Sequence, residues 1–193
     1  MFTNRRVLLN NYVRGYPKVT DFRLDDSAEV HLSITDGAVA VLLKNLYLSC
    51  DPYMRHRMSN SVTHPGTIIH SFSPDSVLEV YGVAEVMDST HPDFEKGNIV
   101  WGLTGWEQYT TVKNPEKLNK INHILPLSYY AGFLGMPGLS AYVGFYELCA
   151  PKQGETVYVS SAAGGVGQLV GQFAKMAGCY VVGSASTKER VEI

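Results

Sequence analysis

Hydrophobic and β-branched residues in the first part of the chain come in short runs, separated by groups of turn-forming residues. The runs occupy residues 39–48, 80–86, 99–103 and 108–112. Turn groups such as His91-Pro92-Asp93 and Lys96-Gly97-Asn98 lie between them. Short strands with turns at this spacing are typical of small antiparallel barrels. The pattern therefore predicts an all-β domain in this part of the chain.

The pattern changes at residue 156, where the β-branched run Thr156-Val157-Tyr158-Val159 gives way to small residues and then to a helical pattern. The helical pattern ends at Gly178, and a second buried strand is predicted over residues 179–183. Strand, glycine turn, helix and strand in this order are typical of a Rossmann-type, doubly wound parallel sheet. We expect this unit to cover residues 155–183.

The small residues between the strand and the helix form a candidate phosphate-binding turn. Gly164 and Gly167 carry no side chain, so backbone amides and the positive end of the next helix can contact a pyrophosphate. A purely structural turn is the alternative, but a glycine turn in this context favours nucleotide binding. The predicted coenzyme contacts in the turn are Ser161, Ala162, Ala163, Gly164, Gly165, Val166 and Gly167.

The end of the second strand bears on which nucleotide is bound. An NAD site usually has an acidic residue here for the ribose hydroxyls, whereas this chain has Ser184. Ser186, Lys188 and Arg190 follow, and the segment from Ser186 to Glu189 fits a capping box at a helix N-terminus. Hydroxyls and cations around one point favour the 2′-phosphate of NADP(H). Ordinary solvated side chains in the first helical turn are the alternative.

The stretch from Ile124 to Tyr146 contains no charged residue, which by length alone could indicate a membrane span. Prolines and glycines interrupt it, however, and it contains no leucine-rich block. We therefore predict a short helix, a break at Pro137-Gly138, and a helix from about Ser140 to Cys149 that is buried between two domains.

Three blocks of sequence carry a family resemblance. They run from Asn45 to Arg55, from Gly135 to Tyr142, and through the glycine turn. In these blocks the chain closely resembles plant NADPH-dependent 2-alkenal reductases, or double-bond reductases. Those enzymes belong to the zinc-independent medium-chain dehydrogenase/reductases, together with the leukotriene B4 12-hydroxydehydrogenases. The resemblance covers essentially the whole chain, but it departs at Ser161, where the family usually has alanine, and at Arg190, where it usually has lysine.

The resemblance implies a fold and an activity. Residues 1–125 would form a GroES-like β-barrel catalytic domain, and residues 126–193 the first portion of an NADP-binding Rossmann domain. The implied reaction is the NADPH-dependent reduction of the α,β-double bond of a 2-alkenal or enone, by hydride transfer to the β-carbon. The substrate would be a small unsaturated aldehyde or ketone. A quinone reductase of the same superfamily is the alternative enzyme.

Reduction of such a double bond without a metal requires a hydrogen-bond donor at the developing enolate oxygen. The resemblance assigns catalytic roles to Tyr53 and Tyr81. Because the chain has 12 tyrosines, a packing role is the alternative for either one. The resemblance also implies coenzyme contacts from Pro52, Tyr53, Met136, Gly138 and Ser140.

Metal chemistry is not indicated by the sequence. Zinc-dependent relatives use a Cys and a His-Glu pair as ligands, and often a second cluster of closely spaced cysteines. None of the six histidines is followed by glutamate, and Cys50, Cys149 and Cys179 are far apart. Cys50-Asp51 is the only feature of the sequence that resembles part of a zinc site. Because the other ligands are missing, we predict no metal. Widely spaced cysteines also argue against disulfides and favour a reducing, cytoplasmic location.

Composition excludes some partners. The 193 residues are 45% hydrophobic and 18% charged, which is enough for the core of one or two domains. The net charge is −2, and Arg5-Arg6 is the only pair of adjacent basic residues. Nucleic acids and anionic membranes are therefore not expected partners.

A doubly wound sheet needs two βαβαβ halves, whereas Ile193 falls about two turns into the helix predicted after the second strand. We therefore expect the activity, and a homodimeric state, in a longer form of the protein. A third interpretation of the 193 residues is an inert module that only binds nucleotide or dimerises.

Overall fold

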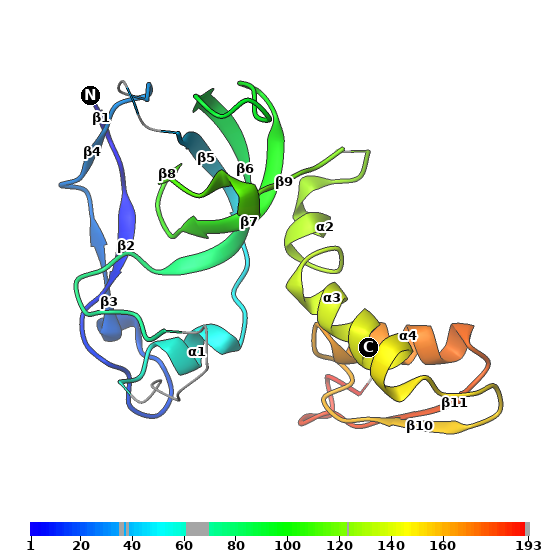
Figure 1. Ribbon diagram of the computed structural model, residues 1–193. Helices are drawn as coiled ribbons and strands as arrows, with labels where there is room; N and C mark the ends of the chain where they lie inside the picture. The colour runs from blue at the N-terminus through cyan, green and yellow to red at the C-terminus, as the bar shows by residue number, and fades with distance from the viewer. Residues whose placement is uncertain (35–36, 38, 61–69, 123, 192–193) are drawn as a thin grey trace. The chain divides into compact units, whose positions relative to one another are not determined.

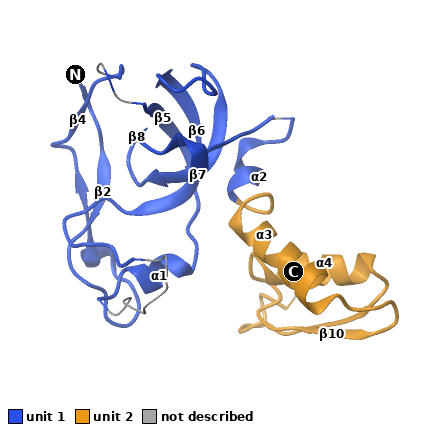
Figure 2. Cartoon of the chain, viewed as in Figure 1, with its two compact units in different colours: residues 1–131 blue, residues 132–193 orange. Residues whose placement is uncertain are grey.

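The computed structural model describes residues 1–34, 37, 39–60, 70–122 and 124–191 (Figure 1). The chain divides into two compact units, residues 1–131 and residues 132–193 (Figure 2). We describe each unit by itself. The boundary between functional domains at residues 125 and 126 stays a prediction.

Unit 1 is built on a five-stranded antiparallel sheet with the strand order β8-β5-β6-β7-β9. Its strands are β5 (Val41–Leu48), β6 (Glu79–Ser89), β7 (Ile99–Gly105), β8 (Tyr109–Val112) and β9 (Asn119–Lys120). The first four of these contain most of each hydrophobic run predicted to be a strand. The all-β character expected for this part of the chain is therefore present.

The N-terminal segment adds two short antiparallel pairs to unit 1. These are β1 (Phe2–Thr3) with β4 (Glu29–Val30), and β2 (Arg6–Leu9) with β3 (Phe22–Asp25). Single bridges join Arg6 to Glu107 and Leu8 to Val77, so β2 is tied to the segments that flank β6 and β7. Unit 1 also contains short helical turns at η1 (Val19–Asp21), α1 (Tyr53–Arg57), η2 (Pro115–Lys117) and α2 (Leu127–Ala131).

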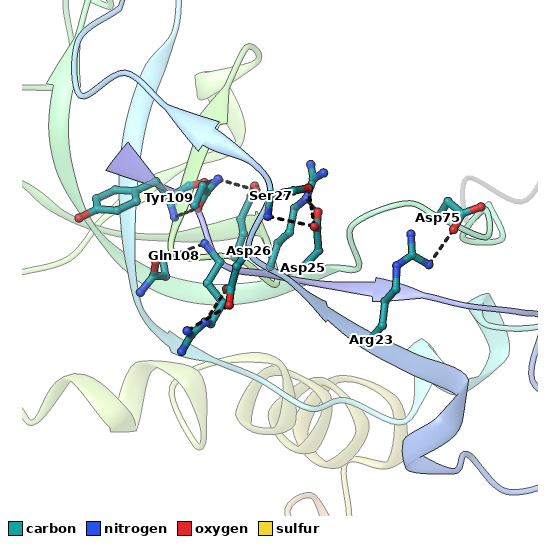
Figure 3. Close-up of polar contacts among 11 residues, drawn as sticks. Arg23, Asp25, Asp26, Ser27, Asp75, Gln108 and Tyr109 are labelled. Carbon is teal, nitrogen blue, oxygen red and sulfur yellow. Dashed lines mark hydrogen bonds and ion pairs between the residues drawn. The ribbon is translucent and has the colours of Figure 1, made fainter. Parts of the chain in front are cut away.

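Charged side chains hold the β2–β3 pair in place. Arg6 Nε lies 2.7 Å from a carboxylate oxygen of Asp25, which also accepts hydrogen bonds from Ser27. These hydrogen bonds, the Ser27 hydroxyl first, lower the pKa of Asp25 to about 2. Figure 3 shows Arg23 on β3 reaching Asp75, 2.7 Å away. The Arg23–Asp75 pair is exposed, and exposed pairs contribute little to stability, so it positions the segment more than it stabilises it.

Unit 1 has two buried apolar clusters. One lies between the N-terminal strands, α1 and β6; it contains Leu9, Val13, Met54, Met58, Phe72, Leu78 and Val80. The other lies within the five-stranded sheet; it contains Val41, Leu43, Ala84, Val86, Phe94, Val100 and Leu118. Burial of these side chains supplies the main driving force for folding this unit.

Unit 2 contains a parallel strand pair and three helical segments. In chain order these are α3 (Met136–Tyr142), η3 (Val143–Cys149), β10 (Thr156–Val159), α4 (Gly167–Met176) and β11 (Tyr180–Gly183). β10 and β11 pair in parallel, and α4 connects them. This is the strand, turn, helix and strand order that the sequence predicts.

The helix expected from about Ser140 differs from the prediction in two ways. It begins four residues earlier, at Met136, because Pro137 occupies the first turn, where a missing N–H costs nothing. From Val143 to Cys149 the backbone is a π-helix, which ends when the amide of Ala150 donates to the carbonyl of Phe145. The predicted break at Pro137-Gly138 is therefore wrong; the irregular residues are 132–135, between α2 and α3.

The helix predicted to follow Ser186 is also not formed in the described residues, which end at Val191. The backbone makes consecutive turns instead, with Arg190 N donating to Thr187 O and Val191 N donating to Lys188 O. A helix needs several successive turns before its hydrogen bonds offset the cost of nucleation.

Of the helices that the structure describes, none is both long enough and apolar enough to cross a lipid bilayer.

A polar cluster inside unit 1 is centred on Asn45 of β5. Its Nδ2 donates to the carbonyl oxygens of Gly105 and Glu107, at 3.0 and 2.8 Å. Its Oδ1 accepts a hydrogen bond from the hydroxyl of Thr104, at 2.6 Å. The side chain thus joins β5 to the turn that follows β7, where β5 also shifts its register against β6.

We predict that Asn45→Ala lowers the free energy of unfolding of unit 1 by about 2 kcal/mol, because it removes the hydrogen bonds to these two carbonyls and leaves the Thr104 hydroxyl with Thr110 alone as a partner. Urea unfolding followed by tryptophan fluorescence measures it, since both tryptophans, Trp101 and Trp106, lie in unit 1. Lys44→Ala, at the exposed neighbouring position, is the control. An unchanged urea midpoint for Asn45→Ala would contradict the prediction.

Candidate coenzyme site and tyrosine face

The turn between β10 and α4 is closed by backbone hydrogen bonds. Ser161 has a positive φ of 50°, and its carbonyl accepts a hydrogen bond from Gly164 N at 2.8 Å. A Cβ on Gly167 would lie 2.9 Å from Ala162 Cα and would also meet the carbonyl of Ser161. Only glycine fits at position 167, so this residue has a structural role in closing the turn.

The N-terminus of α4 is open. The residue before it, Val166, has no side chain that caps the first amides of the helix, and Ser161, Gly164 and Gly165 in the turn are exposed. The amides of Gln168 and Leu169 already donate to the carbonyls of Gly164 and Val166. The exposed turn and the positive end of the helix still form a favourable environment for an anion. The turn residues predicted from the sequence therefore fit a pyrophosphate.

The end of β11 is tied to this turn. Ala162 N donates to Ser184 O at 2.8 Å, and Ser184 N donates to Val159 O at 3.0 Å. A Cβ on Gly183 would lie 2.8 Å from the Cβ of Ala162, so glycine is needed where the two segments approach. The hydroxyl groups of Tyr158 and Ser184 are also within hydrogen-bond distance, at 2.8 Å.

Gly183 and Tyr158 were not predicted as parts of this site. Gly183 could have been found from the sequence, because a glycine that ends the second strand allows the two loops to approach closely. The pairing of Tyr158 with Ser184 depends on the register of β10 against β11, which the sequence does not specify.

Ser186, Lys188 and Arg190 lie just beyond Ser184, and all three are exposed. No ion pair of Lys188 or Arg190 is found within the described ranges. Two cations without a carboxylate partner among the described residues, in the segment that follows Ser184, fit a 2′-phosphate. Their role in binding stays a prediction.

The segment from Met136 to Ser140 lies in the same unit and reaches the glycine turn. A Cβ on Gly165 would lie 3.6 Å from Cβ of Pro137, so the start of α3 is in van der Waals range of the turn. Gly138 is buried, with no room for a side chain beside the carbonyl of Phe133. The predicted nicotinamide contacts of Met136, Gly138 and Ser140 are not tested, and Gly138 has a packing role in any case.

Tyr53 and Tyr81 lie in unit 1, where they face each other. Pro52 caps α1 and is exposed, and Tyr53 is the first residue of that short helix. Tyr81 is on β6, and the two rings meet edge to face with their centroids 6.4 Å apart. The structure therefore brings the two predicted catalytic tyrosines together; their catalytic roles stay predictions.

The hydroxyl of Tyr53 is in an unusual environment. It is buried, and no hydrogen bond of good geometry reaches it from the described residues. Burial, followed by the negative charge of nearby Asp51, raises the pKa of Tyr53 to about 12. Asp51 is 8% exposed and accepts a hydrogen bond from the Ser49 hydroxyl at 2.9 Å. Tyr53 is thus protonated across the physiological pH range and able to donate.

A cavity of about 680 Å³ also lies in unit 1. Arg57, Glu79, Leu103 and Glu107 are among its lining residues, while neither Tyr53 nor Tyr81 contributes. Burial raises the pKa of the Glu107 carboxyl. The predicted catalytic tyrosines, Tyr53 and Tyr81, therefore do not line this cavity.

Cys50 is exposed, next to Asp51. The described parts of the chain contain no group of three or more His, Cys, Asp or Glu side chains placed to hold a metal ion.

Comparison with known proteins adds to this geometry. The family described as the N-terminal domain of oxidoreductase matches residues 5–121. The 2-alkenal reductase (NADP(+)-dependent) of Nicotiana tabacum is 54% identical over 192 residues, which are 99% of this chain and 55% of that protein. The (+)-pulegone reductase of Mentha piperita is 53% identical over 196 residues, 100% of this chain and 56% of that protein.

A solved structure also matches. The crystal structure of CurA from Vibrio vulnificus in complex with NADPH has a TM-score of 0.83 and 34% sequence identity, over 96% of this chain and 52% of that one. The chain spans about half the length of the curated relatives it matches. The predicted fold class, a GroES-like barrel followed by the first part of a Rossmann-type sheet, is confirmed. The chain belongs to the medium-chain oxidoreductase family that includes the tobacco 2-alkenal reductase.

Proposed function

We propose that this chain, continued to the length of its relatives (the full-length form), is an NADPH-dependent reductase of the α,β-double bond of 2-alkenals and enones. The observation that supports NADPH as the coenzyme is the exposed glycine turn, which is hydrogen-bonded to the end of β11, where Lys188 and Arg190 follow. The names of two relatives that are more than half identical, a 2-alkenal reductase and a pulegone reductase, support the reaction.

The residues of unit 2 would bind the coenzyme. The turn amides and the N-terminus of α4 would hold the pyrophosphate, and Ser186, Lys188 and Arg190 the 2′-phosphate. Bound NADPH supplies a hydride, which an enone accepts at its β-carbon. Met136, Gly138 and Ser140 would contact the nicotinamide end.

The residues of unit 1 would act on the substrate. As the β-carbon receives the hydride, negative charge develops on the carbonyl oxygen of the substrate. The Tyr53 hydroxyl is protonated and donates to no acceptor in the described structure, so it would donate a hydrogen bond to this oxygen. Tyr81 would form a wall of the substrate pocket, and Pro52 would support Tyr53 beside the coenzyme.

We also propose that the full-length form is a homodimer in the cytoplasm. The three cysteines are free, with Cys50 and Cys149 exposed, which supports a reducing compartment.

Steady-state kinetics with NADPH test the function. We expect the full-length form to reduce an unsaturated aldehyde with a higher kcat/KM than a quinone, and a chelator to leave this activity unchanged. The 193-residue chain is assayed in parallel, with NADPH binding measured by calorimetric titration. A faster reaction with the quinone would favour a quinone reductase, and loss of activity with the chelator would contradict the metal-free mechanism.

The coenzyme preference is a second test. We expect the full-length form to prefer NADPH to NADH by at least about tenfold in kcat/KM, roughly 1.4 kcal/mol. Arg190→Ala should reduce this preference more than Lys188→Ala, because a guanidinium can bind phosphate through two hydrogen bonds. Lys175→Ala, at the far end of α4, is the control. Equal use of both coenzymes by the unmutated enzyme would overturn the assignment.

Tyr53→Phe removes the proposed donor and keeps the ring. We expect kcat/KM to fall about 100-fold, with the affinity for NADPH unchanged. Because the pKa of Tyr53 is raised to about 12, its donor form is present below that pH and is lost only above it. The kcat/KM profile from about pH 6 to 9 should therefore show no ionisation of Tyr53. Tyr16→Phe, at a side chain that is 93% exposed, is the control; equal activity of both variants would refute the role.

A further inference from the structure

We propose that Trp101 is a positioning residue: it holds the ring of Tyr81 in place and thereby sets which unsaturated carbonyl compounds the enzyme accepts. This inference rests on the proposed function, which gives Tyr81 its place in the substrate pocket. Its basis is the contact between the rings of Tyr81 on β6 and Trp101 on β7, and Trp101 has no role in the proposed reaction.

The two rings are stacked. Their centroids are 5.0 Å apart and their planes differ by 12°. In the antiparallel register of β6 and β7, Tyr81 lies opposite Leu103 and Trp101 lies opposite Val83. Tyr81 and Trp101 are therefore diagonal neighbours on one face of the sheet, a separation that large aromatic side chains bridge. Stacking of this geometry is favourable beyond the area it buries.

The other face of these strands fixes the direction of both rings. Gly82 and Gly102 lie opposite each other, and each points into the packed side of the sheet. A Cβ on Gly82 would lie 2.6 Å from the carbonyl oxygen of Tyr47, and one on Gly102 would lie 2.7 Å from Leu118. A register slip by one residue would force larger side chains into this space. Tyr81 and Trp101 must therefore share the opposite face.

Tyr81 is contacted by two aromatic rings. Trp101 stacks on it in parallel, and Tyr53 meets it edge to face at 6.4 Å. Because Tyr53 is the proposed donor, the orientation of Tyr81 also defines the space beside that donor. Without the Trp101 ring, Tyr81 could turn to another staggered rotamer, and the pocket would lose a defined wall. The consequence would be weaker binding of bulky substrates, with little effect on the chemical step.

The test is a double-mutant cycle in the full-length form, with a bulky cyclic enone and a small linear alkenal as substrates. We expect Trp101→Ala to raise KM for the cyclic enone about tenfold, to change kcat less than twofold, and to leave KM for NADPH unchanged. Trp101→Phe should restore most of the loss, because it keeps an aromatic face. In a Tyr81→Ala background, Trp101→Ala should have no further effect on KM. Trp106→Phe is the matched control.

Two results would overturn the inference. One is an unchanged KM in Trp101→Ala; the other is an equal rise in KM with and without Tyr81. If Trp101→Ala fails to fold, the cycle is run with Trp101→Leu. A second measurement is the tryptophan emission of the Trp106→Phe variant, from which the emission of the Trp101→Leu, Trp106→Phe double variant is subtracted to leave the signal of Trp101. There the emission of Trp101 should change when the saturated ketone binds, and this change should be absent in Tyr81→Ala. If the unmutated enzyme reduces no unsaturated carbonyl compound, the proposed function itself fails. If it does reduce them, but Trp101→Ala leaves KM unchanged or raises it equally with and without Tyr81, only the role of Trp101 is rejected.

Discussion

Unit 2, the proposed coenzyme-binding half, depends on one steric constraint. The turn after β10 comes so close to the start of α4 and to the end of β11 that side chains do not fit at positions 167 and 183. Position 167 has no space for a side chain beside Ser161 and Ala162, and position 183 has none beside Ala162. These close approaches allow Ala162 N to reach Ser184 O. The same contact ties the end of β11, which the hydroxyl and cationic residues follow, to the glycine turn. The proposed site for both phosphate groups of one coenzyme thus depends on two glycines.

Unit 1, the proposed substrate half, depends on a different constraint, the two-residue period of antiparallel strands. Glycines on β6 and β7 meet the packed side of the sheet, so the residues between them, Tyr81 and Trp101, are directed to the other side. Helix α1 adds Tyr53 to this face. Because the glycines occupy the packed side, the aromatic residues next to them in sequence lie on the other side of the sheet. The two rings contact each other because the strands are in a fixed register.

The sequence predicts the parts of the structure that depend on local pattern. The strands β5 to β8, the glycine turn and the βαβ unit follow from apolar runs and from glycines. The missed features are of two kinds. The Asn45 cluster joins residues about 60 positions apart, which a local pattern does not contain. The π-helical segment after α3 and the turns after Ser186 are local departures from a regular α-helix that apolar periodicity does not distinguish.

The candidate site shows the same division. The turn residues and the tyrosines could be named from motifs, but the state of the Tyr53 hydroxyl could not. It depends on burial and on the charge of Asp51, two residues earlier, and both effects disfavour the phenolate. A group that must donate to a developing enolate has to hold its proton while remaining free of other acceptors. Tyr53 fits both conditions within the described structure, since the ionised form is disfavoured and the hydroxyl donates to no acceptor there. Under the proposed role, the fold would hold the donor ready before any substrate binds, which is the preorganisation that electrostatic catalysis requires.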